Sequence, residues 1–503
     1  TKAHINALAK ALNAISKQYY SKQLAYPRHS FSVKFPFQLL RPRLAFDAPN
    51  KCVNINDAEY QVSNESIMIY PPGIPLIIPG EVFTPTLIKR INNYKKTGIT
   101  ILSHYDNGNV DIVNLENWRK YKFAEIKLKE YEMNHLISPR SDDYIAPFEG
   151  KEHQGTLMLL PYRSDTWRLH GEKARANYLE VVRAIAKYEK VYLGIDPSIY
   201  TKVIDECMQL ENVECLKIKY NDAWARDNMP IFVSNGEKLR CVDFRFNAWG
   251  GTFDGLYSDY QDDDRLSAKV AKFFNLESYH VNDFVFEGGS ISLDGEGTCL
   301  VTEACLLSEG RNPQYSKYEI EEMIKEYFNV SKIIWLKHGI YKDETNEHVD
   351  NMACFARPGV ILLAWCDDKE DPQYKYSQNV YRKLSKEEDA QGMPFKIIKV
   401  RIPGPLYVTA DESKGVTKSR HDAKARLTND RLAGSYINFY QSDKFVILPS
   451  FGVTQDEVTL RQFKKIFPEK DIIQMNTREI LLGGGNIHCI TMQIPKVEGK
   501  KEC

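Results

Sequence analysis

From residue 147 onward, short apolar runs alternate with stretches of helical periodicity, and this alternation is the strongest constraint on the fold. The first apolar runs are TLMLLPY (156–162), KVYLGI (190–195), VECLKIKY (213–220) and IFVSNGEKLRCVDFRF (231–246). Between the first two runs, residues 172–189 carry one apolar helical stripe, formed by Ala174, Tyr178, Val182, Ile185 and Tyr188. Strands separated by amphipathic helices predict an α/β fold.

The same alternation continues toward the end of the chain. We expect further strands near 298–302, 332–336, 360–365, 396–401 and 444–448. We expect helices near 197–210, 316–328, 376–386, 430–441 and 455–466.

The length of 503 residues predicts at least two domains, because single cores seldom grow beyond about 300 residues. A charge-dense stretch, 117–146, is the predicted linker, with domains at 1–116 and 147–497. The first domain should be small and α+β. It has an apolar helical face within 1–20, a proline-rich extended segment at 70–81, and a helix at 84–97 with Thr84 as N-cap and Pro85 in the first turn.

Charge and cysteine content exclude several classes of protein. Lys plus Arg and Asp plus Glu both total 67, so no net field favours nucleic acid or an acidic membrane. No apolar run approaches the ~18 residues of a membrane helix, and the first 30 residues do not read as a signal peptide. The ten cysteines include no CxxC pair, which argues against a zinc site and a disulfide framework. We expect reduced thiols, a cytoplasmic location, and no metal or cofactor.

Four segments place polar residues at the ends of apolar runs: NDAWARDNMP (221–230), FEGGSISLDGEGT (286–298), DETNEHVDNMACF (343–355) and GGGNIHC (483–489). Each has an ordinary structural explanation when taken alone. The WxRD run suits a surface ion pair, and a glycine triplet suits a tight turn. Cys489 suits a small buried thiol.

In this order the four segments resemble the agmatine deiminases. Further blocks that carry the resemblance are FNAWGG (246–251), DGEGT (294–298), IIWLKHGIYKDET (333–345), GVILLAWCDD (359–368), PGPLY (403–407) and SYINFY (435–440). The wider family, which includes bacterial-type peptidylarginine deiminases, has the pentein fold. The resemblance therefore implies an α/β propeller of five ββαβ-like units, about 70 residues each.

The resemblance also implies five catalytic residues, and the chemistry of a guanidinium explains their types. This cation is delocalised and poorly electrophilic, so it needs carboxylates to hold it and a strong nucleophile. Asp227 and Asp350 would grip the cation, and Cys489 would attack its carbon to form a thiouronium. His348, oriented by Glu287, would protonate the leaving ammonia and then activate water. His348, rather than the neighbouring His488, is the expected acid and base.

Residues expected to bind substrate are Trp224, Glu344, Gly484 and Gly485, together with the two aspartates. Glu344 matches the acidic position of the agmatine-specific motif, where it would meet the terminal ammonium, and Trp224 could stack on the chain. The glycines would let the backbone approach the substrate, although packing would also favour them. The chain departs from the usual pattern at Asn346–Glu347 and in SISLD, and the first change adds bulk beside the amine site, so arginine and peptidyl-arginine stay as alternative substrates. A non-catalytic scaffold that binds polyamine or partner subunits is the alternative from another class.

The first domain resembles a different family. RPRLAF (41–46) and YPPGIPLIIPGE (70–81) are similar to the C-terminal domain of bacterial arginine, lysine and ornithine decarboxylases. The Ser-x-His-Lys run that holds pyridoxal phosphate in those enzymes is not found, so we expect no decarboxylation by this chain. Together with the start at Thr1, this predicts a piece of an arginine decarboxylase–agmatine deiminase fusion. A homo-oligomer, associated with a decarboxylase portion, is the expected assembly. The polar stretch 409–431 is either a loop over the active site or a solvated loop.

Overall fold

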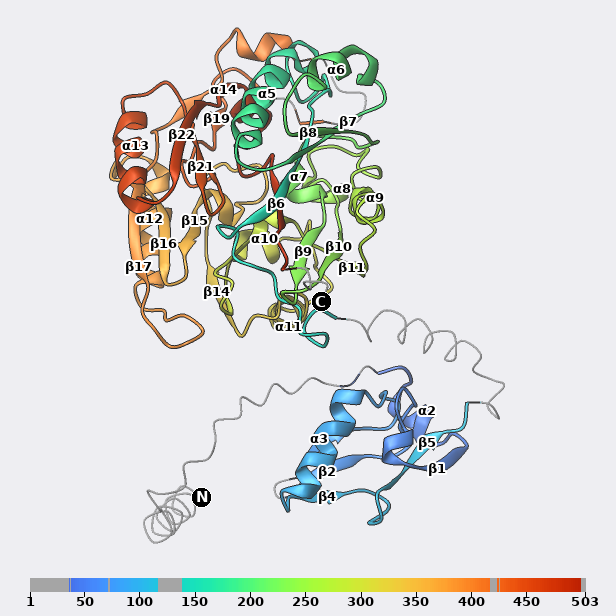
Figure 1. Ribbon diagram of the computed structural model, residues 1–503. Coiled ribbons are helices and arrows are strands. Elements are labelled where there is room, and N and C mark those ends of the chain that lie inside the picture. The colour runs from blue at the N-terminus through green and yellow to red at the C-terminus, as the bar shows by residue number, and fades with distance from the viewer. Residues whose placement is uncertain are drawn as a thin grey trace, which may run out of the picture. The chain divides into compact units, whose positions relative to one another are not determined.

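The structure is a computed structural model that describes residues 36, 38–70, 73–115, 138–416, 423–424 and 426–498. The chain divides into two compact units, Thr1–Glu132 and Met133–Cys503, and each is considered by itself (Figure 1). The helix expected within 1–20 and most of the expected linker lie outside the described residues. Within the described ranges, no helix has both the length and the apolar character needed to cross a membrane.

The first unit combines short helices with antiparallel strands. Strand β1 (Asn50–Asn54) pairs with β5 (Asn109–Val113), and β2 (Ile67–Tyr70) pairs with both β3 (Ile74–Ile77) and β4 (Thr100–Leu102). Its other elements are α2 (Pro42–Phe46), η1 (Ile55–Asp57) and α3 (Pro85–Lys96). The predicted start of α3 is confirmed, because the Thr84 side chain accepts a hydrogen bond from the Leu87 amide and Pro85 opens the helix.

In the second unit, five sheets of the described residues share one strand order, an antiparallel pair followed by a parallel partner. Three of them are β9–β10–β11 (Ile231–Ser234, Leu239–Arg245, Ser278–Val285), β12–β13–β14 (Ile291–Leu293, Thr298–Thr302, Lys332–Leu336) and β15–β16–β17 (Ala353–Arg357, Val360–Trp365, Lys396–Arg401). The fourth is β20–β21–β22 (Tyr440–Gln441, Phe445–Ser450, Asp471–Asn476). The fifth joins the ends of the unit, since β23 (Met492–Pro495) pairs with β6 (His153–Leu159), followed by β7 (Val191–Ile195) and β8 (Val213–Lys217).

Helices provide the crossovers to the parallel strands, as the alternation predicted. The crossover helices are α5 (Glu172–Ala186), α6 (Tyr200–Cys207), α9 (Leu266–Phe273), α11 (Lys317–Phe328), α12 (Pro372–Leu384) and α13 (Gln455–Ile466). The predicted stripe of α5 faces the core, where Tyr178, Val182 and Ile185 are fully buried. Helix α11 starts at a capping box in which Ser316 and Glu319 bond each other's backbone amides. The unit is α/β.

The helix expected at 430–441 is wrong. This segment holds two short strands with a turn between them: β19 (Arg431–Leu432) pairs with β18 (Leu406–Tyr407), residues 436–438 form the turn, and β20 lies at its end. Its apolar residues imitate helical spacing, but residues 435–442 are buried on all sides. A surface helix would expose one face of this segment to water, whereas short strands and a turn inside the core do not.

The last part of the expected linker belongs to the second unit. Tyr144 and Ala146 are buried in its core, and Ile145 forms a β-bridge with Ser234. The charge-dense stretch 117–146 therefore includes residues that belong to the second unit and is longer than the linker itself.

Candidate active site

The polar residues singled out in the sequence lie in the connections between successive sheets. Asp227 is in α7 (Ala225–Asn228), between β8 and β9, and Glu287 precedes η4 (Gly288–Ser290), between β11 and β12. His348 and Asp350 flank the start of η5 (Val349–Asn351), between β14 and β15. Cys489 follows α14 (Arg478–Gly483) and precedes β23. Because the five sheets repeat one topology, equivalent connections bring distant parts of the sequence together.

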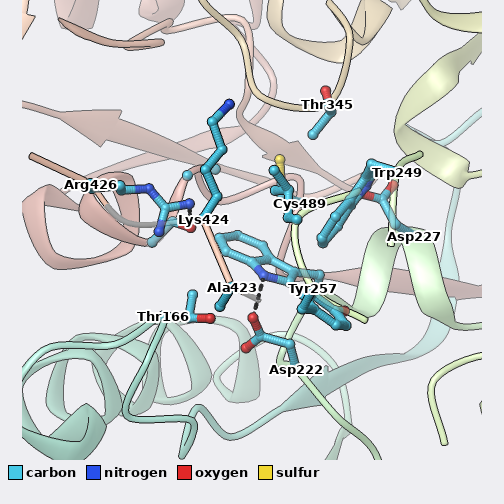
Figure 2. A pocket seen from close by; sticks show the side chains of 15 residues that line it. Thr166, Asp222, Asp227, Trp249, Tyr257, Thr345, Ala423, Lys424, Arg426 and Cys489 are labelled. Atoms are coloured by element: carbon cyan, nitrogen blue, oxygen red, sulfur yellow. Dashed lines mark hydrogen bonds between the residues drawn. The ribbon is translucent and has the colours of Figure 1, made fainter. Parts of the chain in front are cut away.

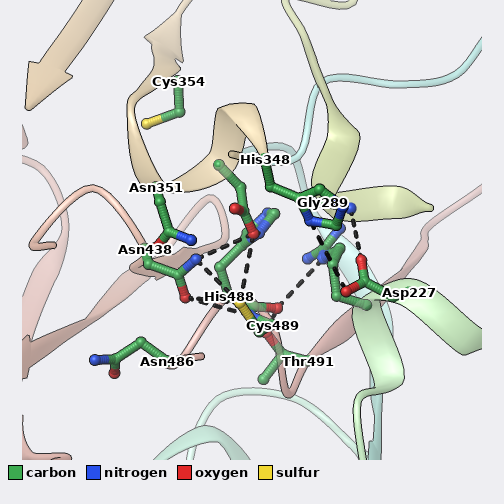
Figure 3. Close-up of polar contacts among 12 residues, drawn as sticks. Asp227, Gly289, His348, Asn351, Cys354, Asn438, Asn486, His488, Cys489 and Thr491 are labelled. Carbon is green, nitrogen blue, oxygen red and sulfur yellow. Dashed lines mark hydrogen bonds and ion pairs between the residues drawn. The ribbon is translucent and has the colours of Figure 1, made fainter. Parts of the chain in front are cut away.

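Gly289 marks the point where three of these residues converge. A Cβ atom built on Gly289 would lie 2.5 Å from His348 Nδ1, 2.9 Å from Asp227 Oδ1 and 3.0 Å from Asp350 Oδ2. The Gly289 amide donates a hydrogen bond of 2.9 Å to Asp227 Oδ1, and the indole of Trp249 donates one of 2.9 Å to Oδ2. The structure therefore brings both predicted carboxylates and the predicted acid–base group around one glycine (Figure 3).

Cys489 is buried beside Asp350. Its Sγ lies 3.5 Å from Asp350 Oδ2 and 3.2 Å from Nδ2 of Asn438, which also donates to Asp350. Burial, and then the negative charges of Asp350 and Asp227, raise the pKa of the Cys489 thiol well above its usual range. A cation bound between the two aspartates would offset their charges and favour the thiolate.

His348 and Glu287 form a fully buried pair. His348 Nε2 lies 3.7 Å from Glu287 Oε2, and Nδ1 lies 4.0 Å from Asp227 Oδ2. Burial lowers the pKa of His348, but Asp227 and then Cys305 and Glu287 outweigh burial and hold it well above the usual value. This environment favours the protonated imidazolium, the form that suits a general acid.

Arg311 supplies the charge that keeps Glu287 ionised inside the protein. Its Nε lies 2.6 Å from Glu287 Oε1, and both side chains are fully buried. Burial raises the pKa of Glu287, but Arg311 and then His348 oppose burial and bring it below the usual value. Arg311 also donates to the carbonyl oxygens of Trp249 and Thr345, so it ties the Trp249 segment to two of the connections that form the site.

A pocket of about 460 Å³ opens above Cys489 and Asp227 (Figure 2). Trp224 forms part of its wall, stacked on Trp167 with ring centroids 5.0 Å apart, and both indoles donate hydrogen bonds to buried Asp222. Gly483, Gly484 and Gly485 form another part of the lining.

Glu344 lies where Gly484 closes the pocket. A Cβ on Gly484 would approach Glu344 Oε2 to 3.0 Å, and its φ of +112° lies in the left-handed region. Glu344 Oε2 accepts a hydrogen bond of 2.5 Å from Arg426, which also donates to the Gly483 carbonyl. Lys424 Nζ lies 3.9 Å from Glu344 Oε1. The described part of the polar stretch 409–431 thus places Lys424 and Arg426 along the pocket.

Three residues of the site were not among the predicted ones. Asn438 lies in the SYINFY block, but this block was predicted to be helical, and that prediction gave no indication of a contact with Cys489. His488 was expected to stay outside the chemistry, yet its Nδ1 lies 3.0 Å from Asp350 Oδ2. Arg311 carries no signal in the sequence, since its partner Glu287 is 24 residues away with no repeated spacing.

Replacing Gly289 by alanine should reduce kcat/KM for the reaction of this site by about 100-fold or more, since displacements near 1 Å have effects of that size. The added methyl would collide with His348, Asp227 and Asp350 together. Gly404→Ala is the control, because Gly404 has φ +97° with no atom near the new methyl, so it should lower stability alone. Steady-state kinetics and thermal melting separate the two effects. Equal activity of Gly289→Ala and wild type would show that a methyl group at this position does not displace the neighbouring site residues.

Two groups of side chains among the described residues have spacing suited to a metal ion. Glu287, Cys305 and His348 offer ligand atoms within 4.8 Å of one another, but the guanidinium of Arg311 already compensates Glu287. In the first unit, Glu65, His104 and Asp111 are similarly close. Glu65 there accepts hydrogen bonds from Ser103 and from the amides of residues 104 and 111, which is a structural role.

Residues 145–495 match the sequence model of the Porphyromonas-type peptidyl-arginine deiminases. The chain belongs to this family. One similar protein, from Latilactobacillus sakei subsp. sakei (strain 23K), is named as an agmatine deiminase. It is 46% identical over 359 residues, covering 71% of this chain and 98% of the relative. An agmatine deiminase-named protein of Listeria monocytogenes serotype 4b (strain F2365) is 44% identical over 360 residues, with the same two coverages.

A solved structure supports the same family assignment. The agmatine deiminase of Enterococcus faecalis, described as catalysing its reaction, has 38% identity and a TM-score of 0.68, and the match covers 71% of this chain and 98% of that one. Residues 32–98 match a different model, the C-terminal domain of Orn/Lys/Arg decarboxylases. Both resemblances stated from the sequence are therefore confirmed at the level of family.

Proposed function

We propose that this chain hydrolyses agmatine to N-carbamoylputrescine and ammonia. The observation that carries the proposal is the convergence of a buried cysteine, two aspartates and a histidine–glutamate pair beside one pocket, with Glu344 behind its lining residues Gly484 and Arg426. Agmatine has a guanidinium at one end and an ammonium at the other, so both of its charged ends have a carboxylate partner there. The family relatives named above carry the same activity in their names.

The first half-reaction forms a covalent bond to Cys489. Asp227 and Asp350 hold the guanidinium, whose charge lowers the pKa of the thiol and favours the thiolate. The thiolate donates an electron pair to the guanidinium carbon and gives a tetrahedral species. His348 then donates its proton to one nitrogen, and the C–N bond breaks. Ammonia departs, and a thiouronium remains on Cys489.

The second half-reaction is hydrolysis of the thiouronium. His348, now neutral, takes a proton from a water molecule, and the resulting hydroxide attacks the same carbon. The C–S bond breaks and the electron pair returns to Cys489 as thiolate. The hydroxyl group loses its remaining proton to solvent as the C=O bond forms, and the ureido product leaves. Glu287 and Arg311 keep His348 oriented and cationic between turnovers.

Deimination of free arginine is a second candidate, and the pocket itself supplies the reason. Lys424 and Arg426 lie beside Glu344, so an α-ammonium and an α-carboxylate would both find partners of opposite charge. The test is direct: the purified chain is incubated with agmatine or arginine, and ureido product and ammonia are measured. Agmatine should give the larger kcat/KM. Full activity on arginine with none on agmatine would reverse the substrate assignment.

Glu344→Gln should raise KM for agmatine by about 5- to 30-fold with little change in kcat, which is the loss of about 1–2 kcal/mol from one partly exposed charge contact. Glu347→Gln is the matched control, since this carboxylate lies in the same loop but contacts His338 instead of the pocket. The control should keep KM within about twofold. An unchanged KM in Glu344→Gln would remove Glu344 from the ammonium site.

The repeated ββαβ order supports a five-unit pentein propeller within Met133–Cys503, and the first unit, Thr1–Glu132, supports a decarboxylase-like domain. Arginine decarboxylation yields agmatine, so a fusion of the two activities is the proposed context of this chain. We further propose a homo-oligomer associated with a decarboxylase portion, in the cytoplasm, where the free thiols of the described cysteines would stay reduced.

A further inference from the structure

His488 links the proposed substrate carboxylate to a second carboxylate behind it. Its Nδ1 lies 3.0 Å from Asp350 Oδ2 and its Nε2 lies 2.9 Å from Glu149 Oε2. Glu149 Oε1 in turn lies 2.9 Å from Nη1 of buried Arg226. With His488 protonated, the four side chains alternate in charge from Asp350 to Arg226. Figure 3 shows His488 beside Cys489.

Both ring nitrogens of His488 face a carboxylate oxygen, so only the doubly protonated imidazolium can donate to both. Burial, and then Arg226, lower the pKa of His488, but Glu149 and Asp350 outweigh them and raise it. The other titratable or charged groups that face this row are His153, Cys354, Asp227, Asp343 and Cys489.

We propose that His488, held by Glu149, is a positioning residue that keeps the Asp350 carboxylate aimed at the guanidinium while the thiolate forms at Cys489. The inference rests on the proposed function, because it assigns His488 a task in the same reaction. The negative charge of Asp350, 3.5 Å from Cys489 Sγ, disfavours the thiolate. The imidazolium of His488 offsets this repulsion from the side of Asp350.

Glu149 also gives this row contact with solvent. It lines a second cavity of about 290 Å³, together with Asp350, Ser292, Gln441 and His488. Its side chain is 24% exposed, whereas His488 is 8% exposed and Asp350 3%. The row is therefore most exposed at its Glu149 member.

Two substitutions of His488 separate its two contacts. Asparagine can place a donor near the Nδ1 position and keep the hydrogen bond to Asp350. Glutamine places its amide near the Nε2 position, so it reaches Glu149 and loses the hydrogen bond to Asp350. We expect His488→Gln to lower kcat/KM for agmatine by about 10- to 100-fold, as for a lost hydrogen bond to a charged group, and His488→Asn to lower it less. Equal rates for glutamine and wild type, or a larger loss in asparagine, would overturn the assignment.

Glu149→Gln tests the charge rather than the contact. Removing this anion should lower the pKa of His488, so activity should fall at a lower pH on the basic side than in wild type. NMR titration of the histidine ring signals in the full chain, assigned with His488→Asn, measures the same shift without substrate. His280→Gln is the control, because His280 has a comparable carboxylate contact of 2.9 Å to Asp243 on an exposed surface.

The NMR result also separates this inference from the proposed function. Should wild type give no ureido product, the proposed function fails, while a His488 signal that titrates at high pH and moves down in Glu149→Gln still supports the charged row. A His488 pKa that is ordinary, or unchanged by Glu149→Gln, overturns it whatever the activity. A purely structural role would lower the melting temperature without moving the titration.

Discussion

Cys489→Ser should abolish turnover of agmatine, with a loss on the order of 10⁴- to 10⁶-fold, while the protein folds normally. A serine hydroxyl fits the space of the thiol, but it is far harder to ionise between Asp350 and Asp227. The electron pair that attacks the guanidinium carbon is therefore lost, whereas the carboxylates that hold the cation remain. Substrate binding should persist, so a bound but unreacted complex is the expected state.

The measurement combines ureido product assay with mass spectrometry after a haloacetamidine probe. Wild type should gain one probe adduct at Cys489, and Cys489→Ser should gain none there. Cys366→Ser is the matched control, since Cys366 is another buried thiol whose neighbour is the carbonyl of Asp368 rather than a site residue. Near-normal turnover by Cys489→Ser would rule out the covalent route.

His348→Gln should reduce kcat by about 10²- to 10⁴-fold, the usual contribution of a general acid and base. Both half-reactions lose their proton carrier, so ammonia release and thiouronium hydrolysis slow together. In wild type, the raised pKa of His348 keeps the acid form present at neutral pH. Activity should therefore be lost as pH rises through that pKa, not as pH falls.

Glu287→Gln shows whether the neighbouring charge sets that limit. The carboxylate helps to raise the pKa of His348, so its removal should move the basic limb of the kcat/KM profile to lower pH. The pH profiles of wild type, Glu287→Gln and the exposed surface variant Glu457→Gln provide the comparison. An identical basic limb in Glu287→Gln and wild type would show that His348 does not depend on this pair.

The segments with the strongest local signals were predictable from sequence. Helix α3 follows from Thr84 and Pro85, and α5 follows from an apolar stripe, because caps and 3.6-residue periodicity act within a few turns. The segment at 431–441 was mistaken for a helix because burial on every side removes the polar face that distinguishes the two periodicities.

By itself, the sequence determined the α/β class, the two family resemblances and the residue types that guanidinium chemistry requires. Tertiary structure alone decided which groups meet. Asp227, Glu287, His348, Asn438 and Cys489 come from five inter-sheet connections, and Gly289 is where Asp227, His348 and Asp350 converge. The ion pairs Arg311–Glu287 and Glu149–His488 likewise join residues far apart in the chain. The physical reason is that local periodicity sets the elements, whereas burial of charge is compensated only by groups that the folded sheets bring into contact.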